Sequence, residues 1–272
     1  MPENSGRILV VASAGNTARA FMKVASDNSI PIVVVVPEKN MENLWSLKTL
    51  KPCVRIVAAG GNSDYYDAIR LAGILCRSDK FISEGGAKNV ARRDGMGTTV
   101  LSAATAIGRI PDFYFQAVGS GTGAIAAYEA NLRLIRDGTY GKKKMRLVVS
   151  QNLPFIPMVL AWRKKARVLD PVDEDDAARQ IGEIDARVLS NRHPPYGITG
   201  GLYDALQDTG GDMLAVGNNE VRQAQALFLE TEGRDICPEA GVALASLMRK
   251  VEDRSVERDA CIMLNITGGG IE

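Results

Sequence analysis

The sequence contains little of what metal centres and histidine-based active sites require. It has a single histidine, His193, which is too few for a multi-histidine metal site and argues against a histidine-based catalytic triad. Its cysteines are scattered without Cys-x-x-Cys spacing, so we interpret them as free thiols in a reducing cytoplasm and predict neither a metal site nor a disulfide framework. The four cysteines are Cys53, Cys76, Cys237 and Cys261.

The sequence also lacks a charge excess and long apolar runs. The formal net charge is +1, which argues against a protein that binds nucleic acid or a membrane surface through bulk charge. No run approaches the roughly 18–20 apolar residues of a membrane span. The opening residues, MPENSGRILVV, have neither the basic start nor the cleavage site of a signal peptide. We therefore expect a cytoplasmic protein with small-molecule ligands.

Short apolar runs alternate with amphipathic stretches of helical spacing along most of the 272 residues. Strands that are apolar on both faces and separated by helices indicate a parallel α/β sheet. Gly95, Gly97 and Pro111 interrupt the pattern, so we expect a domain boundary near residues 95–111. The expected strands are 7–12, 31–36, 54–59, 80–83, 112–118, 145–150 and 260–266. The expected helices are 17–28, 64–76, 96–107, 124–137, 173–186, 200–208, 218–231 and 238–252.

The segment QAVGSGTGAIAAYEA carries the clearest binding signal. A strand ends at Val118, a turn of small residues follows, and a helix is expected from Ala124. Glycines let the backbone approach an anion, and a helix N-terminus offers unpaired N–H groups with about half a positive charge. We predict a phosphate site here, although a turn without a ligand is the alternative. The predicted ligands are the backbone and hydroxyls of Gly119, Ser120, Gly121, Thr122 and Gly123.

Two nucleotide-binding motifs compete for the same segment. Gly119, Gly121 and Ala124 fit the pattern G-x-G-x-x-A of a dinucleotide-binding unit. That unit needs an acidic residue at the end of the next strand to hold the ribose, and here residues 150–152 are Ser-Gln-Asn. The phosphate-binding loop of nucleoside triphosphatases is excluded because no Gly-Lys-Ser/Thr follows. We therefore disfavour a nicotinamide cofactor.

Two further loops follow strands. SAGNT, residues 13–17, lies after the first strand, where the Asn16 amide can donate to a ligand and Thr17 can cap the next helix. A loop with a simple helix cap is the alternative. Near the other end, Thr267 and three glycines follow the last strand, at the sheet edge where α/β proteins usually bind ligands. A flexible tail is the alternative there.

These segments, in order, resemble a known family. SAGNT, GNSDYYDA (61–68), EGGAKNVARRDGMGT (84–98), GSGTG and TGGG resemble threonine synthases and their cysteate-synthase relatives. These are pyridoxal-phosphate enzymes of the tryptophan-synthase-β fold type. EGGAKNVARRDGMGT, QAVGSGTGAIAAYEA and SQNLPFIPM (150–158) look more particularly like cysteate synthase. The resemblance covers nearly the whole chain and implies two open parallel-sheet subdomains, a small one at 7–95 and a large cofactor-binding one at 96–272.

The resemblance also implies roles for individual residues. Asn16 would contact the cofactor's 3′-oxygen, residues 119–123 its phosphate, and Thr267 its pyridine nitrogen. A neutral hydroxyl at that nitrogen would leave the ring unprotonated and favour elimination at Cβ. Ser13, Ala14, Gly15 and Thr17 would approach the substrate carboxylate. Candidates for binding the substrate phosphate are Lys88, Arg92 and Arg93, each of which is as easily explained as part of a solvated charged face.

The implied reaction is replacement of the phosphate of O-phospho-L-serine by sulfite, which gives L-cysteate for coenzyme M biosynthesis. A threonine synthase acting on O-phosphohomoserine with water is the alternative, and a paralogue that binds the cofactor or a phosphate ligand without catalysis is another. The family usually forms dimers, so a homodimer or other homo-oligomer is possible.

The lysine that forms a Schiff base with the cofactor in this family has no counterpart in the sequence. In the family it precedes the SAGNT strand, and no lysine precedes Ser13 here. The first lysine, Lys23, falls on a helix where the family has no catalytic residue. We therefore assign no catalytic residue. We expect a chain that lacks the N-terminal part of the large subdomain, either through truncation or as a degenerate paralogue, and that is inactive alone.

Overall fold

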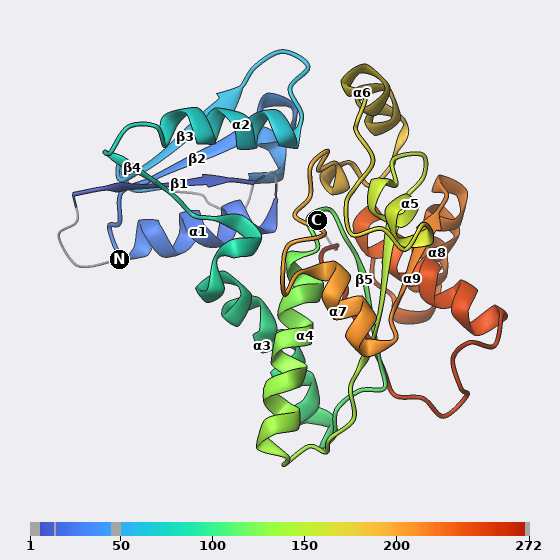
Figure 1. Ribbon diagram of the computed structural model, residues 1–272. Coiled ribbons are helices and arrows are strands. Elements are labelled where there is room, and N and C mark those ends of the chain that lie inside the picture. Colours follow the sequence, from blue (N-terminus) through green and yellow to red (C-terminus); the bar gives the residue numbers. More distant parts are fainter. Residues whose placement is uncertain (1–5, 14, 45–49, 270–272) are drawn as a thin grey trace. The chain divides into compact units, whose positions relative to one another are not determined.

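The protein divides into two compact units, Met1–Gly85 and Gly86–Glu272. The computed structural model describes residues 6–13, 15–44 and 50–269 (Figure 1). The division falls between Gly85 and Gly86, whereas the sequence placed a boundary near residues 95–111. Residue 95 lies inside a helix, α3 (Val90–Ile107), which begins six residues earlier than the sequence pattern predicted, at Val90 instead of residue 96.

The first unit is a parallel sheet with a helix on each face. Its strand order is β3-β2-β1-β4, and every described pair is parallel. The central strand β2 has six buried residues, as expected for a strand covered on both faces. Helix α1 packs through Ala18 and Met22 on one face, and α2 packs through Ala68 and Ala72 on the other. The elements are β1 (Ile8–Ala12), α1 (Asn16–Asp27), β2 (Ile32–Pro37), η1 (Glu38–Leu44), β3 (Val54–Ala59), α2 (Tyr65–Leu75) and β4 (Phe81–Ser83).

The second unit is built on another parallel sheet, with strand order β7-β6-β5-β8. Strand β5 lies between β6 and β8, so segments far apart in the sequence become neighbours at the centre of the sheet. Its strands are β5 (Phe113–Ala117), β6 (Arg146–Asn152), β7 (Asp212–Val216) and β8 (Ile262–Leu264). Its helices are η2 (Gly86–Lys88), α3, α4 (Thr122–Asp137), α5 (Pro157–Arg163), α6 (Glu174–Glu183), η3 (Arg187–Leu189), α7 (Leu202–Thr209), α8 (Asn218–Glu232) and α9 (Pro238–Glu252).

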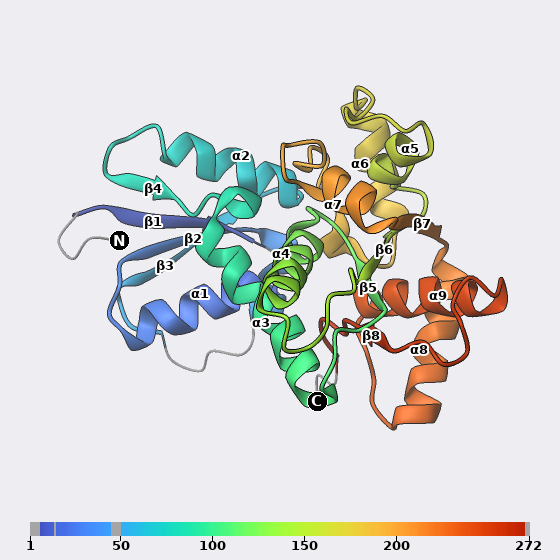
Figure 2. The ribbon, with the colours of Figure 1, turned by 60° about the horizontal axis from the view of Figure 1, so that its bottom comes forward.

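Side chains alternate between the two faces of this sheet. Tyr114, Leu147 and Met213 belong to the cluster that packs against α3, α4, α5 and α7. Phe113 and Phe115 point to the opposite face, where α9 lies along the sheet with α8 outside it (Figure 2). The structure therefore confirms the predicted parallel α/β class, with both faces of each sheet covered.

The sequence analysis missed β7 and α5. Strand β7 has only four apolar residues, DMLAV after two glycines, and such a short run is ambiguous by periodicity alone. Helix α5 is a two-turn helix entered through Pro157, in a segment read only as a family motif. None of the helices in the described ranges combines the length and the apolar character required to cross a bilayer.

Candidate functional site

The loop between β5 and α4 is shaped by glycines that no other residue could replace without movement. Gly121 has φ +80°, and a Cβ there would lie 2.9 Å from Cδ2 of Leu202. A Cβ at Gly119 would lie 3.2 Å from Cα of Leu189. Two later segments of the same unit, at Leu189 and Leu202, therefore pack closely against the loop. These contacts were not evident from the sequence.

The same loop presents hydrogen-bond donors that the protein does not use. The first bond of α4 runs from the N–H of Ile125 to the carbonyl of Gly121, at 3.0 Å. The N–H groups of Gly123 and Ala124 consequently have no acceptor within the described part of the chain. The hydroxyls of Ser120 and Thr122 lie 2.8 Å apart beside them. Unpaired N–H groups at a positive helix end, with two hydroxyls, form a site for an anion such as a phosphate.

Thr267 follows the neighbouring strand, β8, in the same unit. Asn265 donates its N–H to the carbonyl of Phe115 at 2.9 Å, so the chain leaves the sheet beside the end of β5. Thr267 is half-buried and contacts the thiol of Cys237, the residue that precedes α9. Cys237 also donates its N–H to the carbonyl of Gly268 at 3.0 Å. The position of Thr267 is therefore fixed jointly by strand β8 and by the start of α9.

The thiol beside Thr267 is a neutral group. Burial, together with the nearby Glu239 carboxylate, raises the pKa of Cys237 to about 11, against the opposing hydrogen bonds from Ala240 and Thr267. A thiol with so high a pKa is a poor nucleophile at neutral pH. Sequence reasoning gave Cys237 no role, and the only signal was its position before Pro238, where a helix starts.

The end of β6 has a structural role. Gln151 and Asn152 are 1% exposed. Gln151 Oε1 accepts the N–H groups of Met158 and Val159, at 2.9 and 3.1 Å, and so fixes the start of α5. Asn152 Oδ1 accepts the N–H of Ala186 at 3.0 Å.

In the first unit, the SAGNT loop lies at the carboxyl end of β1. Ser13 is buried, and its hydroxyl accepts the N–H of Ala18 at 3.2 Å. Ser13 therefore makes the capping contact that the sequence analysis had given to Thr17, because α1 already begins at Asn16 and Thr17 lies within its first turn. Asn16 is exposed, and its side-chain oxygen accepts from Arg19. The expectation for Ala14 falls outside the described residues.

The three candidate cations lie around the start of α3, in the second unit. Lys88 is exposed at the end of η2, and Arg92 and Arg93 are half-buried in the first turn of α3. Arg93 Nε donates to Oε2 of Glu129 on α4 at 2.9 Å. Arg93 therefore joins two helices, and a substrate would have to compete with Glu129 for its charge.

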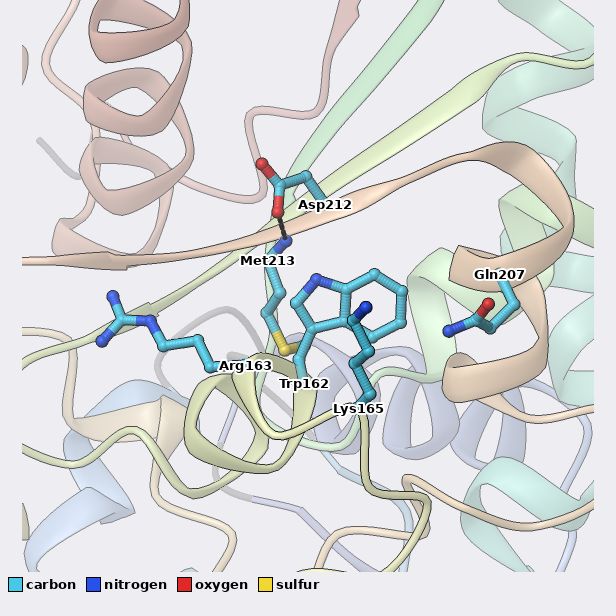
Figure 3. Close-up of a pocket in the computed structure, with 6 residues that line it drawn as sticks. All are labelled: Trp162, Arg163, Lys165, Gln207, Asp212 and Met213. Atoms are coloured by element: carbon cyan, nitrogen blue, oxygen red, sulfur yellow. Dashed lines mark hydrogen bonds between the residues drawn. The ribbon is translucent and has the colours of Figure 1, made fainter.

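A separate cavity of about 480 Å³ lies at the other edge of the second sheet (Figure 3). It is lined by Trp162, Arg163, Lys165, Gln207, Asp212 and Met213. Asp212 is the first residue of β7, whereas the glycine loop follows the last residue of β5. Amino ends and carboxyl ends of parallel strands lie at opposite edges, so this cavity is remote from the phosphate loop.

Comparison with known proteins identifies the class of proteins to which this chain belongs. The sequence model of the pyridoxal-phosphate dependent enzymes matches residues 2–268, and the chain belongs to that family. Maize serine racemase has the same fold, with a TM-score of 0.70 at 14% identity over 98% of this chain and 73% of that structure. The expectation of a fold shared with pyridoxal-phosphate enzymes of this type is confirmed.

Within the family the similarity is to one kind of enzyme. The chain is 49% identical over 271 residues to cysteate synthase of Methanosarcina barkeri, covering 99% of this chain and 65% of that protein. It is 52% identical over 267 residues to cysteate synthase of Methanoregula boonei, covering 98% of this chain and 62% of that protein. The chain therefore spans about two thirds of the length of these relatives.

The residues present fit the phosphate of this cofactor. The loop at 119–123 has unpaired N–H groups, two hydroxyls and glycines whose Cβ atoms would collide with their surroundings. Thr267 supplies a hydroxyl three residues after the end of the adjacent strand β8, next to an uncharged thiol. The loop therefore fits a phosphate monoester.

Proposed function

We propose that this chain carries the cofactor and substrate sites of a cysteate synthase, which exchanges the phosphate of O-phospho-L-serine for sulfite and releases L-cysteate and inorganic phosphate. The observation that carries the proposal is the anion site at the start of α4, in a chain about 50% identical to cysteate synthases over nearly its whole length. The four cysteines, which form no disulfide, suit the cytoplasm as the place of this reaction.

In this proposal residues 119–123 hold the cofactor phosphate, Asn16 contacts the ring oxygen and Thr267 faces the ring nitrogen. Bound pyridoxal phosphate supplies an electron sink for the reacting amino acid. The groups near the ring nitrogen determine how strongly the cofactor withdraws electrons. Thr267 and the neutral Cys237 thiol beside it are uncharged, so neither of them would hold the ring nitrogen in its protonated form.

The other loops are proposed to bind the substrate. Ser13, Ala14, Gly15 and Thr17 are proposed to bind the amino acid carboxylate. Both the leaving phosphate and the incoming sulfite are anions, so cations are needed near Cβ. Lys88, Arg92 and Arg93 are the proposed cations, and a substrate would compete with Glu129 for Arg93. Covalent attachment of the cofactor and transfer of the α-proton require a lysine that this chain does not supply before Ser13.

The test compares two proteins: the chain as given, and the chain preceded by the in-frame codons upstream of Met1. Each is incubated with pyridoxal phosphate, O-phosphoserine and sulfite, and phosphate release and cysteate are measured by colorimetry and mass spectrometry. We expect cysteate from the longer protein alone.

Each other outcome selects a different function. Threonine formed from O-phosphohomoserine, with no cysteate from O-phosphoserine, would identify a threonine synthase. Cofactor binding without turnover in both proteins would identify a non-catalytic paralogue. Light scattering on the same samples tests the expected homo-oligomer.

A further inference from the structure

We propose that Gln116 is a positioning residue of the cofactor site, held by Tyr114 and Asn265 so that its amide shapes the first turn of α4. This inference rests on the proposed function in one respect, that the loop at 119–123 binds the cofactor phosphate. Sequence reasoning gave none of these three residues a role, although Gln116 opens the segment QAVGSGTGAIAAYEA. A buried hydrogen bond between Tyr114 and Gln116 and a partly buried one between Asn265 and Tyr114 carry the inference.

The chain of bonds runs across the face of the sheet that α4 covers. Tyr114 is 1% exposed, and its hydroxyl lies 2.9 Å from Oε1 of Gln116, two residues along β5. The amide nitrogen of Asn265, just after β8, lies 2.8 Å from the same hydroxyl. One phenol therefore joins side chains from two adjacent strands, at the strand ends that lead into the glycine loop and Thr267.

The order of donors fixes which way the Gln116 amide faces. An amide NH₂ can only donate, so Asn265 makes the Tyr114 hydroxyl an acceptor, and the phenolic proton is left to point at Gln116. The group that receives this proton must be the amide oxygen, which turns Nε2 of Gln116 away from Tyr114. Burial makes each of these bonds costly to break, because a lost partner is not replaced by water.

The turned amide lies against Gly123, the second residue of α4. A Cβ at Gly123 would lie 2.4 Å from Nε2 and 2.7 Å from Oε1 of Gln116. Gly123 is not among the glycines with positive φ, so its backbone conformation does not demand glycine. Glycine is required at this position because the amide of Gln116 leaves no room for a Cβ. The N–H of Gly123 is one of the unpaired donors of the anion site, so Gln116 sets the position of a group that touches the phosphate.

The same hydrogen bonds also extend to the segment that carries Thr267. Asn265 is two residues before Thr267, and its own N–H is bonded to Phe115 of β5. Tyr114 therefore ties the phosphate loop and the segment carrying Thr267 to one buried hydroxyl. A purely structural role would make the three residues important for stability alone. A positioning role makes them important for ligand affinity in a protein that stays folded.

The test measures binding of pyridoxamine 5′-phosphate to the full chain by calorimetry, because this form of the cofactor needs no lysine. We expect Gly123→Ala to weaken binding about tenfold or more, the loss expected for one displaced donor to a charged oxygen. Gln116→Ala removes the obstructing amide, so Gly123→Ala should cost at most about threefold in that background. Gly182→Ala, an open position in α6, is the matched control and should bind like the unchanged chain.

Two further readouts separate the possible failures. The midpoint of urea unfolding for the unchanged chain, Gly123→Ala, Gln116→Ala and the double variant tests the steric coupling without any ligand. Equal effects of Gly123→Ala in both backgrounds would overturn the inference. Tyr114→Phe should weaken binding of pyridoxamine phosphate several-fold while far-ultraviolet circular dichroism stays unchanged. An unchanged chain that binds no pyridoxamine phosphate would overturn the proposed function together with this role. Normal binding by the chain and by Gly123→Ala would overturn the role alone.

Discussion

The hydroxyl oxygens of Ser120 and Thr122 lie 2.8 Å apart, on either side of Gly121. The N–H of Thr122 also points to Ser120 Oγ, at 3.4 Å, so the serine hydroxyl is held inward over the start of α4. Thr122 is 3% exposed and Ser120 half-buried. Each hydroxyl can exchange this mutual bond for a bond to a phosphate oxygen without moving the backbone, which describes a preorganised site.

Replacement of the buried hydroxyl should separate binding from stability. Thr122→Val keeps the shape and removes one donor, so we expect affinity for pyridoxamine phosphate to fall about five- to twentyfold, corresponding to about 1–2 kcal/mol. Isothermal calorimetry measures the affinity and urea unfolding the stability. Thr209→Val is the control, since that hydroxyl bonds to the carbonyl of Ala205 near the end of α7. Equal affinity in both variants would contradict a phosphate contact by Thr122.

Two glycines with the same backbone conformation should respond differently to substitution. Gly121 and Gly138 have φ of +80° and +83°, but only Gly121 has a neighbour where the new Cβ would lie. Gly138→Ala should cost about 1–2 kcal/mol of unfolding free energy from backbone strain alone. Gly121→Ala should cost more, because its Cβ would meet Leu202, and it should also abolish ligand binding. Denaturant unfolding and calorimetry of both variants check this difference.

Two buried tyrosines offer a comparison of satisfied and unsatisfied hydroxyls. Tyr114 has two hydrogen-bond partners, whereas the hydroxyl of Tyr196 has none among the described residues. Tyr114→Phe should lower the free energy of unfolding by about 1–3 kcal/mol. Tyr196→Phe should leave it unchanged or raise it slightly. A larger loss at position 196 would show that its hydroxyl has a partner in solution, such as a buried water.

Acid should weaken the junction between β5 and β8 through Asp112. Burial raises the pKa of this carboxyl, but the hydrogen bonds from Lys143 and from the N–H of Cys261, with the charges of Lys143 and Arg109, together hold the pKa below its ordinary value. The stability that a lowered pKa contributes is complete above the unfolded-state pKa of about 3.9, and it is lost as pH falls through the folded-state value.

The measurement is urea unfolding at pH 7 and at successive values below pH 4. Asp112→Asn should flatten the decline, with a loss of about 1 kcal/mol at pH 7. The control is Asp170→Asn, which removes an ion pair whose partners are both more than half exposed and should change little. The same decline in the unchanged chain and in Asp112→Asn would assign the acid sensitivity to other groups.

The chain as given should bind cofactor without a specific covalent bond. After incubation with pyridoxal phosphate and reduction by borohydride, peptide mapping should find no stoichiometric label on any one lysine, Lys23 included. Low, scattered labelling of exposed lysines is expected and serves as the background. A single lysine modified in full would show that this chain supplies its own attachment point and would reverse our assignment of no catalytic residue.

The glycine loop was predictable because it lies within one continuous segment, where a strand, small residues and a helix follow one another. Even there the helix begins at Thr122, two residues before the predicted start, which places that hydroxyl inside the first turn. The role of Gln116 was not predictable. It depends on Tyr114, Gly123 and Asn265 meeting across two strands and a helix, and hydrophobic periodicity carries no information on such contacts.

The same distinction applies to the fold. The strands of a parallel sheet could be predicted from apolar β-branched runs such as residues 32–36, which are buried. Their order could not, because the pairing of β5 with β8 depends on which distant segment fills the place beside Phe113. The capping of α1 by Ser13 was likewise missed, since five residues separate the donor from the acceptor.

The pairing of β5 with β8 has a consequence for how the protein acquires its function. Tyr114 and Asn265 are 151 positions apart, so their bond closes one of the longest loops in the chain. Contacts of such separation form late, because the entropy of closing the loop must be overcome first. During synthesis on the ribosome, the phosphate loop emerges well before the strand that completes its neighbourhood. Affinity for the cofactor should therefore appear only after β8 has paired with β5, which makes ligand binding a reporter of that pairing.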